Sequence, residues 1–200
     1  MNRGFTLIEL LVSLAIFALM TALVVAKFGN FNQSTLLTDT AYDVALALRT
    51  AQSYGLSVKN STAGSPAFSY PYGIDFNSTA TGAACDSYTS TDQLFVLFAD
   101  KDSNHLCGSG DLGISTYALT RGAYISYLCA GSDQATCHSN PAITSLDISF
   151  QRPNPEASIC SSGFNPACSY AYAEITVTSN DKSNSRTISV RQNGQITVLK

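Results

Sequence analysis

The sequence predicts an α+β protein in which a long N-terminal α-helix packs on a C-terminal antiparallel β-sheet domain. Residues 5–26 form an apolar run long enough to cross a membrane. Residues 37–55 carry an apolar stripe at helical period. After residue 94 the chain changes to short β-branched and aromatic runs, and strands that follow one long helix are typical of an antiparallel sheet.

The apolar run has two ordinary interpretations. A helix over residues 5–26 rises about 33 Å at about 1.5 Å per residue, which suits a single-pass anchor. A secretory signal cleaved after Val24-Val25-Ala26 would instead release the chain, as for a secreted hydrolase. Neither explains Glu9, because a carboxylate costs roughly 2.5–3.5 kcal/mol at the bilayer centre and less near the interface.

The second half of the predicted helix is amphipathic. Its apolar positions recur at steps of three and four and include small residues that allow another element to approach closely: Leu37, Ala41, Val44, Leu48, Ala51 and Gly55. We expect this stripe to pack on the sheet.

The rest of the chain reads as strands and turns. Tyr70-Pro71-Tyr72-Gly73 is typical of a loop. Strand-like runs cover residues 94–99, 114–119, 123–128, 143–150, 171–178 and 187–198. Asn193-Gly194 divides the last run and predicts a type I′ hairpin that pairs Ile188 and Val190 with Ile196 and Val198.

Composition limits the function classes. The chain has 200 residues, is 45% apolar and 12% charged, and carries a net charge of −3. These values suit one globular domain plus a segment, and they argue against a general nucleic-acid binder, which would be basic. The basic residues near the last hairpin are typical of a solvated sheet edge, so nucleic acid is not expected as a partner.

The six cysteines all follow the apolar run, which favours an oxidising compartment and disulfide bonds. They are Cys85, Cys107, Cys129, Cys137, Cys160 and Cys168. Pairing of sequence neighbours is one of 15 possible connectivities. The alternative is a zinc site of His105, Cys107, Cys137 and His138, but its spacing is not finger-like, so no cofactor is expected.

Residues 100–111, DKDSNHLCGSGD, resemble the start of an EF-hand loop. Asp100, Asp102 and Asn104 stand at alternate positions, and Asp111 stands at the twelfth. His105 occupies the position that needs glycine, so the choice lies between a looser calcium loop and a plain polar turn. Neither a GxSxG elbow nor an HExxH motif occurs in the sequence, and we expect no enzymatic activity.

Residues 4–10, GFTLIEL, resemble the signature of prepilin-like proteins: type IV pilins, minor pilins and type II secretion pseudopilins. The resemblance implies that a prepilin peptidase cleaves between Gly4 and Phe5 and N-methylates Phe5. It also implies that Glu9 pairs with the Phe5 amine of a neighbouring subunit in the filament. A buried charge then sets the register between packed helices.

A looser resemblance narrows the choice among the prepilin-like proteins. ALRTAQSYGLSV at 47–58 and TISVRQNGQITV at 187–198 are similar to GspH/FimT-like members. Residues 10–28 lack the proline of many major pilins, which favours a minor pilin or a pseudopilin. The alternative function is a surface-displayed binding module, such as a tip adhesin or a DNA-uptake receptor, that uses the helix for delivery.

The resemblance also implies a domain organisation. We expect a prepilin leader at 1–4, a transmembrane and filament-core helix at 5–27, its extracytoplasmic half at 28–58, and a disulfide-braced β-rich domain at 59–200. The expected location is the inner membrane, with the C-terminal domain extracytoplasmic, and later the filament. The expected partners are other pilin or pseudopilin subunits, prepilin peptidase, the inner-membrane assembly platform and, before assembly, membrane lipid.

Overall fold

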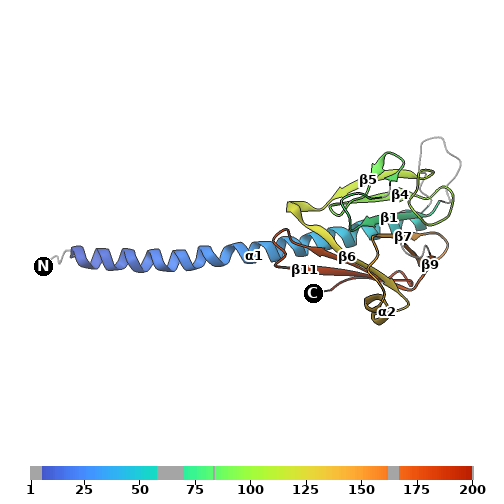
Figure 1. Cartoon of the computed structure of the whole chain (residues 1–200). Helices are drawn as coiled ribbons and strands as arrows, with labels where there is room; N and C mark the ends of the chain where they lie inside the picture. The colour runs from blue at the N-terminus through green and yellow to red at the C-terminus, as the bar shows by residue number, and fades with distance from the viewer. Residues whose placement is uncertain (1–5, 58–69, 83, 162–166, 200) are drawn as a thin grey trace. The chain divides into compact units, whose positions relative to one another are not determined.

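The computed structural model describes residues 6–57, 70–82, 84–161 and 167–199. The chain forms two compact units, residues 1–36 and residues 37–200, and helix α1 (Leu7–Leu56) contributes to both. The predicted α+β class is confirmed. An apolar N-terminal helix precedes a C-terminal domain whose described strands pair antiparallel (Figure 1).

The described strands form a six-stranded sheet, a four-stranded sheet and a two-stranded ladder. The first sheet runs in the order β5 (Leu112–Ala118), β4 (Leu94–Ala99), β1 (Tyr72–Asn77), β7 (Ser145–Phe150), β8 (Ala157–Ser161) and β9 (Ala167–Tyr170). The second runs β12 (Ile196–Leu199), β11 (Ser185–Arg191), β10 (Tyr172–Thr178) and β6 (Tyr124–Gly131). The ladder is β2 (Ala84–Cys85) with β3 (Tyr88–Thr89), and the short helices are η1 (Thr120–Gly122) and α2 (Gln134–Ser139).

The apolar stripe of α1 packs as expected. Its residues from Leu37 to Ala51 are buried and share one core with residues of both large sheets. Near its end the helix approaches the first sheet closely, because a Cβ atom added to Gly55 would lie 2.2 Å from the carbonyl oxygen of Phe150. On the second sheet, Gln52 Nε2 donates to the carbonyl oxygen of Gly194 at 3.3 Å. One helix face therefore lies against both sheets (Figure 1).

The register of the last hairpin is confirmed, but the turn type is wrong. Ile188 pairs with Val198 and Val190 with Ile196. A type I′ turn needs positive φ at both central residues. Gly194 has a φ of 82°, whereas Asn193 does not adopt positive φ. The Gly194 amide donates to the carbonyl oxygen of Arg191 at 2.9 Å, so the glycine closes a longer turn instead of occupying the centre of a tight one.

The loop expected at Tyr70-Pro71-Tyr72-Gly73 is wrong for its last two residues, which begin β1. This strand is buried on both faces. Ile74 and Phe76 face the main core, while Gly73 and Asp75 face the other way and are buried as well. Gly73 fits there because a Cβ would lie 2.8 Å from the Phe98 ring. The tight packing of β1 therefore depends on a residue that reads as a turn former in the sequence.

Gly55→Ala tests the close approach of helix and sheet. An added methyl has no room beside Phe150, so we expect the free energy of unfolding to fall by about 1–3 kcal/mol. Chemical denaturation of the detergent-solubilised chain, followed by circular dichroism, measures the change. The matched control, Ser53→Ala, is exposed on the same helix and should shift stability by less than about 0.5 kcal/mol. A stabilised Gly55→Ala variant would contradict the close approach.

Candidate functional site

The first turn of α1 contains a reciprocal hydrogen-bond cap. Thr6 precedes the helix, and its backbone amide and hydroxyl both donate to Glu9 Oε2, at 3.0 and 2.8 Å. The Glu9 amide donates in return to Thr6 Oγ1 at 3.4 Å. The pattern Thr-x-x-Glu is a capping box, a helix-start signal that is visible in the sequence but was not among the predicted features. Gly4 and Phe5, the expected cleavage residues, lie outside the described residues.

The segment that follows is predominantly apolar. Residues Leu7–Val25 have a mean hydropathy of 2.5, and none of this span is buried within the structure. Its large side chains are exposed over more than half of their surface, from Val12 at 54% to Leu7 at 78%. By length and composition it is a candidate membrane span. A helix of this kind buries its surface in lipid or among other apolar helices.

The cap provides hydrogen bonds to the Glu9 carboxylate, which lies at the start of this span. Two donors from Thr6 replace part of the hydration that Glu9 loses at the edge of an apolar phase. The positive end of the helix dipole stabilises the same charge. The first turn of the helix therefore supplies hydrogen-bond donors to the Glu9 carboxylate from within the same chain.

The comparison with protein families agrees with this geometry. Residues 1–25 match the model of the prokaryotic N-terminal methylation motif. No curated protein and no solved structure matches the chain. The motif and the apolar helix support a type IV pilin-like prepilin, which prepilin peptidase processes and which assembles with other pilin subunits. The motif indicates a structural subunit rather than an enzyme.

The six cysteines form three disulfide bonds in chain order. The bonds join Cys85 to Cys107, Cys129 to Cys137, and Cys160 to Cys168. The zinc alternative is not assembled, because Cys107 and Cys137 belong to different disulfides. His138 instead contacts Glu174.

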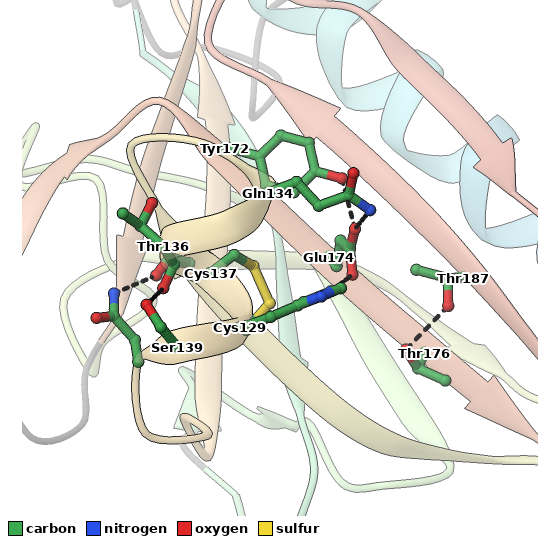
Figure 2. The surroundings of a disulfide bond; sticks show 12 residues. Cys129, Gln134, Thr136, Cys137, Ser139, Tyr172, Glu174, Thr176 and Thr187 are labelled. Carbon is green, nitrogen blue, oxygen red and sulfur yellow. Dashed lines mark hydrogen bonds and ion pairs between the residues drawn. A yellow bond between two sulfur atoms is a disulfide. The ribbon is translucent and has the colours of Figure 1, made fainter.

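Beside the Cys129–Cys137 bond, Glu174 gathers three side chains (Figure 2). This carboxylate is buried on β10 and accepts from Gln134 Nε2 at 3.0 Å and from the Tyr172 hydroxyl. His138 Nε2 lies 2.6 Å from its second oxygen. Burial, together with the hydrogen bond to Glu174, raises the pKa of Tyr172 to about 12. Since Gln134 and His138 belong to α2, the cluster fastens this short helix to the sheet.

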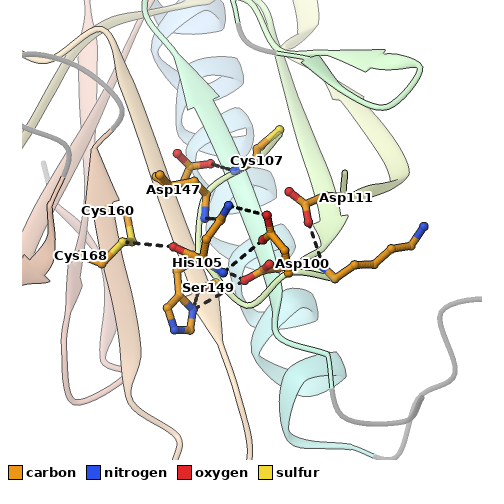
Figure 3. Close-up of polar contacts among 12 residues, drawn as sticks. Asp100, His105, Cys107, Asp111, Asp147, Ser149, Cys160 and Cys168 are labelled. Carbon is orange, nitrogen blue, oxygen red and sulfur yellow. Dashed lines mark hydrogen bonds and ion pairs between the residues drawn. A yellow bond between two sulfur atoms is a disulfide. The ribbon is translucent and has the colours of Figure 1, made fainter. Parts of the chain in front are cut away.

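The acidic loop expected to be a calcium loop or a polar turn connects β4 to β5 (Figure 3). Asp100 and Asp111 are buried and Asp102 is exposed, and each offers a carboxylate oxygen within 4.8 Å of the others. Asn104 serves the loop itself. Its Nδ2 donates to Asp102 Oδ2 at 2.8 Å, and its Oδ1 accepts from the Leu106 amide at 2.7 Å. The structure thus gathers the three aspartates and turns Asn104 toward the backbone.

A second acidic pair lies beneath the loop. Asp75 on β1 and Asp147 on β7 are register partners and are 0% and 1% exposed. Burial raises the pKa of Asp75 to about 6. Burial, and then the charge of Asp75, raise the pKa of Asp147 well above its ordinary value. This pair is not apparent from the sequence, because the two residues become neighbours only through strand pairing.

The pair predicts a pH dependence of stability. The folded pKa of Asp75 lies above its unfolded value, so stability is greatest below the unfolded pKa and falls as pH rises through about 6. In a buffer that contains a chelator, so that no metal ion compensates the carboxylates, we expect the free energy of unfolding of the wild-type chain to fall by roughly 2–3 kcal/mol between about pH 4 and about pH 7.

Asp75→Asn should flatten this dependence, although Asp147 retains its own contribution. Thermal unfolding across the pH range compares the two chains, with the exposed Asp39→Asn as control. Parallel pH profiles for wild type and Asp75→Asn would show that the buried pair carries no such cost.

Proposed function

We propose that the chain is a minor pilin or a pseudopilin of a type IV pilus or a type II secretion-like filament. In this proposal it is cleaved between Gly4 and Phe5, N-methylated at Phe5, and held in the inner membrane with its C-terminal domain extracytoplasmic. The observation that carries the proposal is the capped Glu9 at the head of the apolar helix within the methylation motif.

The mechanism is an exchange of surroundings. In lipid, the apolar side chains of Leu7–Val25 face hydrocarbon, and hydrogen bonds from Thr6 replace part of the hydration of the Glu9 carboxylate. In the filament, the same side chains contact neighbouring helices, and the Glu9 carboxylate turns to the Phe5 ammonium of another subunit. Pairing a buried carboxylate with one specific cation sets the register, because any other position leaves both charges unpaired.

The narrower assignment has support from sequence. The GspH/FimT-like patterns lie at the end of α1 and in the β11–β12 hairpin, which contact each other through Gln52 and Gly194. A proline-free span at 10–28 also favours a minor subunit or a pseudopilin.

Processing is tested by coexpressing the chain with a prepilin peptidase and measuring the intact mass and N-terminal sequence of the membrane-bound product. We expect a chain that begins at N-methylated Phe5. Gly4→Leu is the control, because the bulky side chain should block cleavage and leave the leader attached. A product that begins near Lys27 in the soluble fraction would contradict the proposal and favour a secreted protein.

Assembly is tested with Glu9→Ala in cells that assemble the filament. We expect normal processing but a decrease of about tenfold or more in the amount recovered in sheared filaments, since the register contact is lost. Ser13→Ala is the matched control, because Ser13 lies in the same span and its hydroxyl donates only to the Leu10 carbonyl oxygen, at 2.9 Å. Equal incorporation of Glu9→Ala and Ser13→Ala would exclude a register role for Glu9.

A further inference from the structure

The loop of residues 100–111 covers the polar face of β1 and β7. The Cys107 amide donates to Asp147 Oδ1 at 3.1 Å, and His105 Nδ1 lies 3.0 Å from Ser149 Oγ (Figure 3). The disulfide from Cys107 to Cys85 ties the loop to β2. Side chains that would otherwise face water are thus enclosed between the loop and the sheet.

The enclosed region has an unbalanced charge. It contains four aspartates with at most 2% of their surface exposed: Asp75, Asp100, Asp111 and Asp147. In the described part of the chain, the one basic side chain within ion-pair distance of any of them is His105, whose Nδ1 lies 3.9 Å from Asp100 Oδ2 and carries a positive charge only when the ring is protonated. Buried carboxylates need a cation or a proton to compensate the loss of hydration.

The oxygens of the loop converge around one point. Carboxylate oxygens of Asp100, Asp102 and Asp111 lie within 4.8 Å of one another. Backbone amides hold two of these side chains: Lys101 and Gly108 donate to the two oxygens of Asp111, both at 2.9 Å, and His105 donates to Asp100 Oδ2 at 2.8 Å. A carboxylate oxygen that accepts one N–H bond retains a second lone pair for a cation.

An unpartnered atom gives independent evidence for a ligand. Asp100 Oδ1 is buried and accepts no hydrogen bond, although the Asp100 side chain is fully enclosed. Such an atom is rare, because buried polar groups in native proteins find partners. It belongs to the same side chain that shares the cluster with Asp102 and Asp111.

We propose that Asp100, Asp102 and Asp111 bind one calcium ion, which is coordinated by Asp100 Oδ1 and by one oxygen from each of the other two side chains. The three ligand atoms are all carboxylate oxygens, a donor set that suits calcium or magnesium better than zinc. Calcium tolerates the irregular geometry of a loop better than magnesium does. Waters complete a coordination of six to eight oxygens. The site does not depend on the filament assignment, so each stands or falls by its own test.

The test is equilibrium dialysis of the detergent-solubilised full chain, stripped with chelator, against radioactive calcium. We expect one ion per chain with a dissociation constant on the order of 10⁻⁴ M. We also expect calcium to raise the midpoint temperature of unfolding, and the same concentration of magnesium to leave it unchanged. Asp102→Asn is the decisive variant, because this side chain is exposed and we expect its replacement to leave the fold intact. It should weaken binding by about tenfold or more, as should Asp100→Asn.

Asp39→Asn, an exposed change on α1, is the matched control and should bind as wild type does. Absence of binding at about 5 mM calcium would overturn the proposal, and would mean that protons compensate the enclosed carboxylates. The proposal would also be overturned if Asp102→Asn bound calcium as tightly as Asp39→Asn and the wild type do, because the ion would then lie elsewhere. Processing of the chain by prepilin peptidase is unaffected by either result.

Discussion

The close approach of α1 to the strands is the constraint on which the C-terminal unit depends. Each large sheet has an apolar face that must be buried, and both faces meet the same helix surface. Ala41, Ala51 and Gly55 leave this surface smooth enough for the strands to come near. A larger side chain at any of the three positions would hold a sheet away and open a gap in a core shared by all three elements.

A consequence of this arrangement is that the first sheet has a second face to cover. The alternation along β1 sends Ile74 and Phe76 to the helix and Asp75 to the opposite side. Ordinarily such a polar face contacts water. Here the long β4–β5 connection lies over it, and the apolar residues Val96 and Phe98 pack there with the Cys85–Cys107 bond. The aspartates are buried because the loop is fastened down.

The helix α1 and the last hairpin were predicted correctly in type and register, because their signals lie within short stretches of sequence. The stripe on α1 repeats every three or four residues, and the Asn193-Gly194 pair lies between two strongly β-branched runs, so helix and hairpin register were predictable. The Thr6–Glu9 cap was readable from its spacing as well. Strand β1 was not predicted, because Pro71 precedes it and Gly73 is its second residue, and both residues are typical of turns.

The tertiary arrangement of the acidic residues was less accessible. Asp100, Asp102 and Asp111 share one loop, so their proximity could be expected from the sequence alone. Asp75 and Asp147 lie side by side on one face of the sheet only because β1 and β7, far apart in the chain, pair in one particular register. Strands β8 and β9 and helix α2 were missed too, since each is short and carries little periodic signal.

The placement of the disulfides determines how the C-terminal unit carries mechanical force. Each bond joins segments that are near in sequence, and α1 contains no cysteine. A tension applied along α1 is therefore carried by its packing against the two sheets and by the chain that continues from the helix to β1, and no disulfide bond shares it. Covalent bonds secure the loops and the small helix at the periphery. The packing between helix and sheets is noncovalent, so under sufficient load it can slip and re-form without breaking a covalent bond.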